Sequence, residues 1–191
     1  MCNNWEYVIH MTFDKEKIDR YDLNLIKQKL LKWINNYNQN NNTNIKYLLI
    51  PEQHKDSAWH IHGLIMNIPK EHLKEFKEND VIPIKIKSKI AQGEKVFDWD
   101  KYSNKFGFVL IEEIRNAEAI SKYITKYITK DLKKTTIKLN EKMYYCSKNL
   151  RRKELIHKGL LKKEFKPDYE NFYVKIKVFN SLEEIIEFLD L

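Results

Sequence analysis

The sequence has 191 residues, with 35 Lys and Arg against 27 Asp and Glu, and its pI is near 9.2. Its 42% hydrophobic and 13% aromatic residues suffice for a core, which excludes a disordered chain, and its length favours one domain or one with a small appendage. Two cysteines, four glycines outside any phosphate-binding pattern, and no apolar run of about 20 residues exclude a disulfide scaffold, a nucleotide-cofactor site such as that of an ATPase, and a membrane protein.

The N-terminal third predicts a strand, a helix and a hairpin. Residues 7–13 are β-branched and aromatic enough for a strand. A helix begins near Asp22, a plausible cap, and the polar tract 38–44 that follows is expected to be a loop. Two apolar runs, 45–53 and 58–67, with a short polar connection, predict an antiparallel hairpin. The apolar stripe of the helix is Leu23, Ile26, Leu30, Trp33, Ile34 and Tyr37.

The rest of the chain is harder to interpret, but it also mixes helices and strands. A helix is expected to begin near residue 116, where Glu118 would lie in a first turn that favours a carboxylate. The other expected elements are, in chain order, a short helix at 71–77, a strand-like stretch at 82–86, a turn at Gly93, a strand at 106–111, a hairpin near 140–141, a strand at 173–179 and a helix at 182–189. This order predicts an α+β fold with a central antiparallel sheet flanked by helices.

A candidate metal site lies in the predicted hairpin. Side chains alternate between the faces of a strand, so His60 and His62 lie on one face and Ile61 on the other. With the hairpin centred near Asp56, Glu52 lies across from His60 on the same face. Two imidazoles and a carboxylate suit Mn²⁺, Mg²⁺, Zn²⁺ or Co²⁺. His54 shares the face of Glu52 and is a reserve ligand, although a loop histidine is the simpler interpretation.

A second candidate site is the repeat Tyr-x-x-Lys over residues 123–130. On a helix, Tyr123 and Tyr127 would lie on one face, between an isoleucine stripe and a lysine stripe formed by Lys122, Lys126 and Lys130. Neighbouring ammonium groups favour the phenolate form of tyrosine, which is the nucleophilic form. Taken alone, a pair of boundary tyrosines beside solvated lysines explains the pattern as well.

The positive charge is concentrated in residues 121–166, which hold 15 Lys and Arg against four Asp and Glu. Such a footprint favours binding to a polyanion, with nucleic acid first, and Arg151, Arg152 and Lys153 are candidate phosphate contacts. A solubilising surface is the alternative. Trp59 and Trp99 have the chemistry to stack on unpaired bases, but a place in or beside the core is the better expectation for each.

Residues 5–150 together resemble the HUH endonuclease superfamily, and within it the rolling-circle replication initiators of plasmids and phages. The resemblance rests on the order of VIHMTF, PEQHKDSAWHIHG, KFGFVLIEEI and AISKYITKYITKD, followed by MYYCSKNL. Two histidines precede paired tyrosines, whereas mobilisation relaxases have the tyrosine first and the short transposases usually have one. His10 stands where the family often has Thr.

The resemblance implies a ferredoxin-like or RRM-like domain over 1–150, followed by a basic extension over 151–191 packed on that same domain. It implies that Glu52, His60 and His62 bind Mn²⁺ or Mg²⁺, and that Tyr123 and Tyr127, assisted by Lys126 and Lys130, nick single-stranded DNA through a 5′-phosphotyrosine. Its implied partners are an origin, expected to form a hairpin, and a host helicase and DNA polymerase, in the cytoplasm of a bacterial host. A single-strand transposase, a relaxase-like enzyme and a non-catalytic nucleic-acid-binding regulator remain alternatives.

Overall fold

The computed structural model describes residues 3–116, 120, 124, 143–152, 161–170, 172, 174–179 and 181–189. The chain forms two compact units, residues 1–151 and 152–191. The helix expected from residue 116, apart from its first residue and two isoleucines, and the hairpin expected near 140–141 lie outside the described residues. Within the described part, no helix combines the length and the apolar character that crossing a membrane requires.

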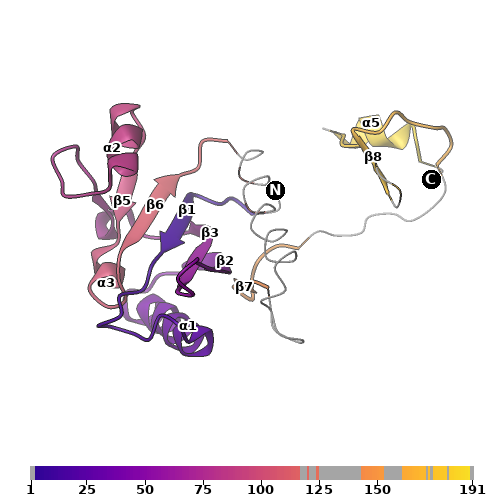
Figure 1. Cartoon of the computed structure of the whole chain (residues 1–191). Coiled ribbons are helices and arrows are strands. Elements are labelled where there is room, and N and C mark those ends of the chain that lie inside the picture. The colour runs from indigo at the N-terminus through magenta and orange to yellow at the C-terminus, as the bar shows by residue number, and fades with distance from the viewer. Residues whose placement is uncertain are drawn as a thin grey trace. The chain divides into compact units, whose positions relative to one another are not determined.

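A seven-stranded antiparallel sheet forms the centre of the first unit, which confirms the predicted α+β fold (Figure 1). Its spatial order is β4-β5-β6-β1-β3-β2-β7, so the first strand of the chain lies in the middle. The architecture is consistent with a ferredoxin-like or HUH fold. The strands are β1 (Tyr7–Met11), β2 (Lys46–Gln53), β3 (Trp59–Met66), β4 (Lys74–Glu75), β5 (Val96–Asp98), β6 (Val109–Glu113) and β7 (Tyr145–Cys146).

One long helix, α1 (Leu23–Asn40), covers one face of the sheet. Asp22 caps it as predicted, because its side chain accepts a hydrogen bond from the Leu25 amide at 3.0 Å. The helix continues into the polar tract that is expected from sequence to be a loop. The reason is that the Asn38 side chain bonds the backbone of Ile45, at 2.8 Å to its amide, and so holds the turn without leaving the helix.

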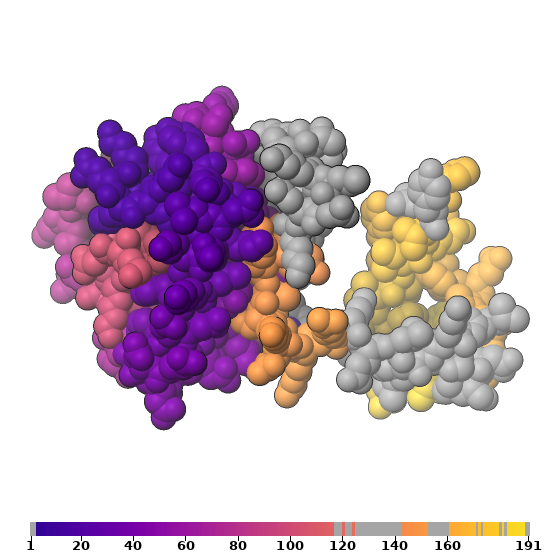
Figure 2. Space-filling view, turned by 90° about the horizontal axis from the view of Figure 1, so that it is seen from below, coloured from indigo at the N-terminus to yellow at the C-terminus, as the bar shows by residue number. Residues whose placement is uncertain are grey.

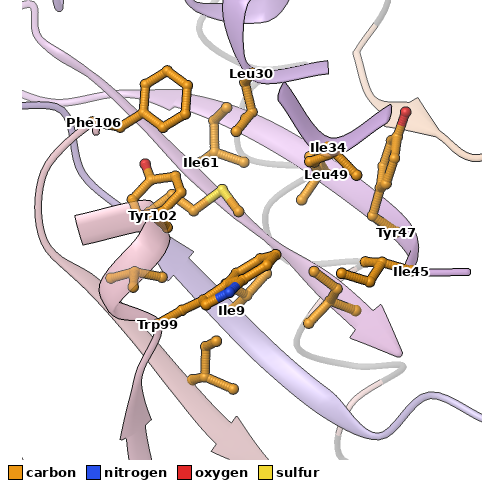
Figure 3. Close-up of a cluster of buried hydrophobic side chains, with 14 of the residues drawn as sticks. Ile9, Leu30, Ile34, Ile45, Tyr47, Leu49, Ile61, Trp99, Tyr102 and Phe106 are labelled. Atoms are coloured by element: carbon orange, nitrogen blue, oxygen red, sulfur yellow. The ribbon is translucent and has the colours of Figure 1, made fainter. Parts of the chain in front are cut away.

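The main core lies between α1 and the sheet (Figure 3). Trp99 and Tyr102 are its largest fully buried side chains, and Trp59 packs against it, as their sequence context predicts. Because strand residues alternate, the odd-numbered residues of β1 face this core while the even-numbered ones face the other side of the sheet. The helix contributes Ile26, Leu30, Ile34 and Tyr37, and the sheet contributes Ile9, Met11, Tyr47, Leu49, Ile61, Ile65, Val109 and Ile111.

The segment between β3 and β6 differs from expectation. The expected helix at 71–77 is a single 3-10 turn, Lys70–His72, followed by β4, because pairing with β5 extends the backbone there. The strand-like stretch at 82–86 instead leads into the helix α2 (Ile84–Ala91), which begins directly after Pro83. Gly93 forms the predicted turn with φ of 77°. The short helix α3 (Asp100–Ser103) has no counterpart among the expected elements, and β6 begins three residues later than predicted.

The basic segment after the undescribed region returns to the sheet. β7 pairs with β2 at the sheet edge, and Figure 2 shows residues 143–152, in orange, against the purple surface of the first unit. The second unit contains β8 (Tyr169–Glu170), β9 (Lys175–Ile176) and α5 (Leu182–Ile186). The strand expected at 173–179 is therefore shorter, because only two of its residues pair with β8. The final helix is confirmed, although it ends earlier than expected.

Candidate functional site

The β2–β3 hairpin has the predicted register. Glu52 lies opposite His60, and Ile50 opposite His62. Ile61 is 1% exposed and faces the α1 core, so alternation directs His60 and His62 to the opposite face, here called the site face. The hairpin thus brings one carboxylate and two imidazoles to one side of the sheet.

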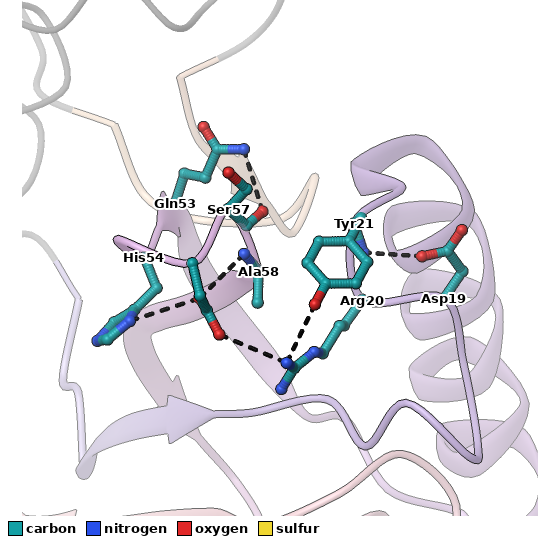
Figure 4. Close-up of polar contacts among 8 residues, drawn as sticks. Asp19, Arg20, Tyr21, Gln53, His54, Ser57 and Ala58 are labelled. Atoms are coloured by element: carbon teal, nitrogen blue, oxygen red, sulfur yellow. Dashed lines mark hydrogen bonds and ion pairs between the residues drawn. The ribbon is translucent and has the colours of Figure 1, made fainter.

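The connection between the two strands is fixed by side-chain contacts (Figure 4). Asp56 accepts a hydrogen bond from the Ala58 amide at 3.2 Å and pairs with Arg20 at 3.4 Å. Arg20 also contacts the Tyr21 hydroxyl, and its carbonyl oxygen accepts a hydrogen bond from the Trp59 amide at 2.8 Å. The segment before α1 therefore holds the turn, and with it the register of Glu52 and His60.

The site face carries a small polar cavity over this hairpin. It has a volume of about 350 Å³ and is lined by Glu52, His54, His60 and His62. Nε2 of His62 lies 2.8 Å from Oε2 of Glu52, and each of these side chains is 15% exposed. The imidazole of His60 stacks on that of His54, with ring centroids 5.0 Å apart. The structure thus brings the three predicted ligands and the reserve ligand to one cavity.

The electrostatics of the cavity favour neutral imidazoles. Burial, followed by the nearby charge of His10, lowers the pKa of His62 to about 4, although Glu52 opposes the shift. Burial, followed by His54, also lowers the pKa of His60. A neutral imidazole retains a lone pair, which a metal ligand needs.

A further imidazole lies on the neighbouring strand. β1 pairs with β3 so that His10 is directly opposite His62, and their Nδ1 atoms are 2.9 Å apart. Nε2 of His10 faces Oε1 of Glu112 on β6 at 3.5 Å. Lys89 from α2 contacts the same carboxylate. Burial alone would raise the pKa of Glu112, but hydrogen bonds from His10 and Lys89 outweigh it and lower that pKa.

Sequence reasoning missed this network of His10, Glu112 and Lys89. A signal is present for His10, since it follows Val8 by two residues on a strand and so shares the face opposite the core. No comparable signal exists for Lys89, because the residues just before it have a strand-like pattern. Its approach to the sheet depends on where α2 packs.

The spacing of the donor atoms matches part of what a divalent metal requires. Adjacent ligands at about 2.1 Å from a metal are roughly 3 Å apart at right angles, so the 2.8 Å spacing of His62 and Glu52 fits two ligands of one ion. As the side chains stand in the described residues, no group of three or more His, Cys, Asp or Glu is arranged to hold a metal. His60 stacks on His54 within the same cavity, so a small rotation of its ring would complete the set.

The other predicted site residues are only partly described. Tyr123, Tyr127, Lys122, Lys126, Lys130 and Lys153 lie outside the described residues. Arg151 and Arg152 are exposed, and the backbone of Arg151 is tied to the Asn3 side chain by hydrogen bonds of 2.9 and 3.0 Å. The two described isoleucines of the tyrosine segment, Ile120 and Ile124, are helical and form a second core cluster on the site face with Val8, Ile50 and Leu64.

Comparison with known families identifies the class of this chain. Residues 6–132 match the model of the replication-associated protein ORF2 family, and this span includes β1, the β2–β3 hairpin, β6 and the tyrosine segment. The chain therefore belongs to the replication-associated protein ORF2 family, which places it among proteins that act in DNA replication. The comparisons with curated proteins and with solved structures gave no match.

Proposed function

We propose that the protein initiates rolling-circle replication by nicking and rejoining single-stranded DNA, with a tyrosine as nucleophile. The observation that carries the proposal is the pairing of Glu52 with His62, beside His60, on the site face of a family member whose tyrosines follow in the same matched span. A regulator that only binds DNA has no need for a half-buried carboxylate among neutral imidazoles.

The placement of Ile120 and Ile124 supports a role for the tyrosines. Leu64 and Val8, against which these isoleucines pack, lie two residues from His62 and His10 on their strands. Two residues of a strand span about 7 Å. The sequence neighbours of Ile124, among them Tyr123 and Tyr127, are therefore expected within a side chain's reach of the cavity.

The proposed reaction breaks one phosphodiester and forms another. A phenol of Tyr123 or Tyr127 loses its proton, and its oxygen bonds to the scissile phosphorus while the bond to the 3′ oxygen breaks. The 3′ oxygen takes up a proton and becomes a free hydroxyl, and the 5′ phosphate stays on tyrosine. Lys126 and Lys130 favour the phenolate. Glu52, His60 and His62 would hold a divalent cation, Mn²⁺ or Mg²⁺, which when bound polarises the phosphate.

The decisive experiment traps the covalent intermediate. The full chain is incubated with Mn²⁺ and a pool of labelled single-stranded oligonucleotides, and adducts that survive denaturation are mapped by peptide mass spectrometry. We expect modification of Tyr123 or Tyr127, loss of the adduct in the double Phe variant and in His60→Ala with His62→Ala, and DNA binding in all of these.

The matched control is Tyr144→Phe, which removes another hydroxyl from an exposed tyrosine of the basic region (47% exposed) and should leave the adduct intact. Adduct formation by the double Phe variant would overturn the proposed nucleophiles. If the wild-type protein binds the DNA but forms no adduct with any member of the pool, the alternative of a non-catalytic regulator is favoured.

A further inference from the structure

We propose that His10 is a positioning residue for the metal site: its imidazole accepts a hydrogen bond from His62 and so directs the opposite nitrogen of His62 toward Glu52. This inference rests on the proposed function, because it concerns the ligand geometry of that same site. It assigns a role to a side chain that lies outside the set of Glu52, His60 and His62.

The four side chains form a continuous path across the sheet. Starting from β6, Oε1 of Glu112 lies 3.5 Å from Nε2 of His10, whose Nδ1 lies 2.9 Å from Nδ1 of His62, whose Nε2 lies 2.8 Å from Oε2 of Glu52. The two rings meet edge to face, with centroids 4.9 Å apart and an interplanar angle of 89°. Each contact joins ring nitrogens to a defined partner, so the path restricts where the protons lie.

The proton positions follow from the carboxylate at the far end. A carboxylate accepts hydrogen bonds, and Lys89 holds Glu112 in its charged form. The neutral His10 that suits this neighbour carries its proton on Nε2 and leaves a lone pair on Nδ1. His62 must then donate from its own Nδ1 to His10, which leaves the lone pair of His62 on Nε2.

That lone pair faces an oxygen of Glu52 at 2.8 Å. Two acceptors at this distance repel each other unless a cation lies between them. A divalent metal bound by both resolves the conflict, and a metal-ligating imidazole generally donates its other N–H to a partner that fixes its tautomer. His10 supplies this partner, and Glu112 orients His10 in turn.

His10 does not fit the role of a ligand to the same ion. Its Nδ1 is directed to His62 and its Nε2 to Glu112, so both nitrogens are used along the path, on the side of His62 away from Glu52. Its side chain is 27% exposed, so it does not serve mainly as core packing. Its effect should therefore appear in metal affinity and in the tautomer of His62.

Two measurements on the full chain test the role. Zn²⁺ affinity is measured by competition with a chromophoric chelator, and long-range ¹H–¹⁵N NMR spectra of the Zn²⁺-loaded protein report which nitrogen of His62 carries the proton. We expect the proton on Nδ1. His10→Ala should weaken Zn²⁺ binding about 10- to 100-fold, whereas His10→Asn, whose amide oxygen can stand where Nδ1 stood, should recover most of it.

The matched control is Leu110→Ala. Leu110 lies opposite His10 on β6, so this variant removes packing from the same row of the sheet without removing the acceptor, and its Zn²⁺ affinity should stay close to that of the wild type. Equal Zn²⁺ affinity in His10→Ala and wild type, or a proton on Nε2 of His62 in the loaded wild type, would overturn the role of His10.

The proposed function fails by a different result. If Glu52→Gln and His60→Ala weaken Zn²⁺ binding while His10→Ala does not, the metal site stands and only the role of His10 is lost. If the wild type does not bind Zn²⁺, the metal site and the role of His10 are both lost. The NMR result on the wild type decides the tautomer even where a variant does not fold.

Discussion

Gly63 is the position where the fold and the site depend most directly on one missing side chain. It lies between His62 and Leu64 on β3, opposite Leu49 of β2 and Ile9 of β1. A Cβ at this position would stand 2.3 Å from the backbone oxygen of Leu48 and 2.9 Å from Cδ2 of Leu49. A side-chain atom can rotate away, but a backbone oxygen moves only if β2 moves.

We therefore expect Gly63→Ala to lower the free energy of unfolding. Overpacking costs about 1–3 kcal/mol, and the upper end applies because the closest contact is with backbone. The smaller entropy of an unfolded alanine returns up to about 1 kcal/mol, which leaves a net loss of about 2 kcal/mol. For a chain of this size that lowers the melting temperature by about 4–8 °C.

The same displacement should reach the site, because β2 carries Glu52. Thermal unfolding followed by circular dichroism gives the stability, and Mn²⁺ titration gives the metal affinity, which should fall as well. The control is Gly93→Ala, where φ is 77° and no heavy atom lies within 4 Å of the new Cβ. It should cost some stability through backbone strain and leave Mn²⁺ affinity unchanged.

A melting temperature of Gly63→Ala within about 1 °C of the wild type would refute the expected displacement of β2. A variant that melted as expected but bound Mn²⁺ as tightly as the wild type would refute its effect on the site. In that second case β2 would have yielded without moving Glu52, and the close approach would be a property of packing alone.

Two further predictions concern charge. The pKa of His62 in the folded protein, about 4, lies below its unfolded value near 6.5, so the stabilisation is complete above pH 6.5 and is lost as the pH falls toward 4, by on the order of 3 kcal/mol; His62→Gln should flatten this acid limb in urea unfolding, and an unchanged limb would contradict the assignment. Replacing Arg151, Arg152 and Lys153 by Ala should reduce the salt dependence of single-stranded DNA binding by about 0.7 in logarithmic slope for each phosphate that the variant no longer neutralises, and an unchanged slope would leave these residues as a solubilising surface.

The hairpin could be predicted because its signals are local. Alternation fixes which residues share a face, and the short connection at Asp56 fixes the register, so Glu52 and His60 could be paired from the sequence. The helix α1 was equally readable, since its apolar stripe matches its buried residues. Its end was not, because Asn38 serves the following turn from within the helix.

The elements that failed depend on distant partners. Ile82, Ile84 and Ile86 alternate as strand residues do, yet Pro83 precedes a helix in which Ile84 is 82% exposed and Ile86 alone of the three packs inside. β4 is two residues long and exists through its pairing with β5. No local pattern distinguishes such a strand from a helix turn, because the free energy that decides between them comes from the neighbouring chain.

The same distinction explains why the site is larger than its motif. The histidine pair and Glu52 lie on one hairpin, but the polar path continues to β1, β6 and α2 through His10, Glu112 and Lys89. Two carboxylates on one half-buried face repel each other unless cations or donors separate them, so the hairpin needs these neighbours to hold its own geometry. A match that extends over residues 6–132, far beyond the hairpin, is what such a dependence requires: the ligands are local in sequence, and the groups that orient them are not.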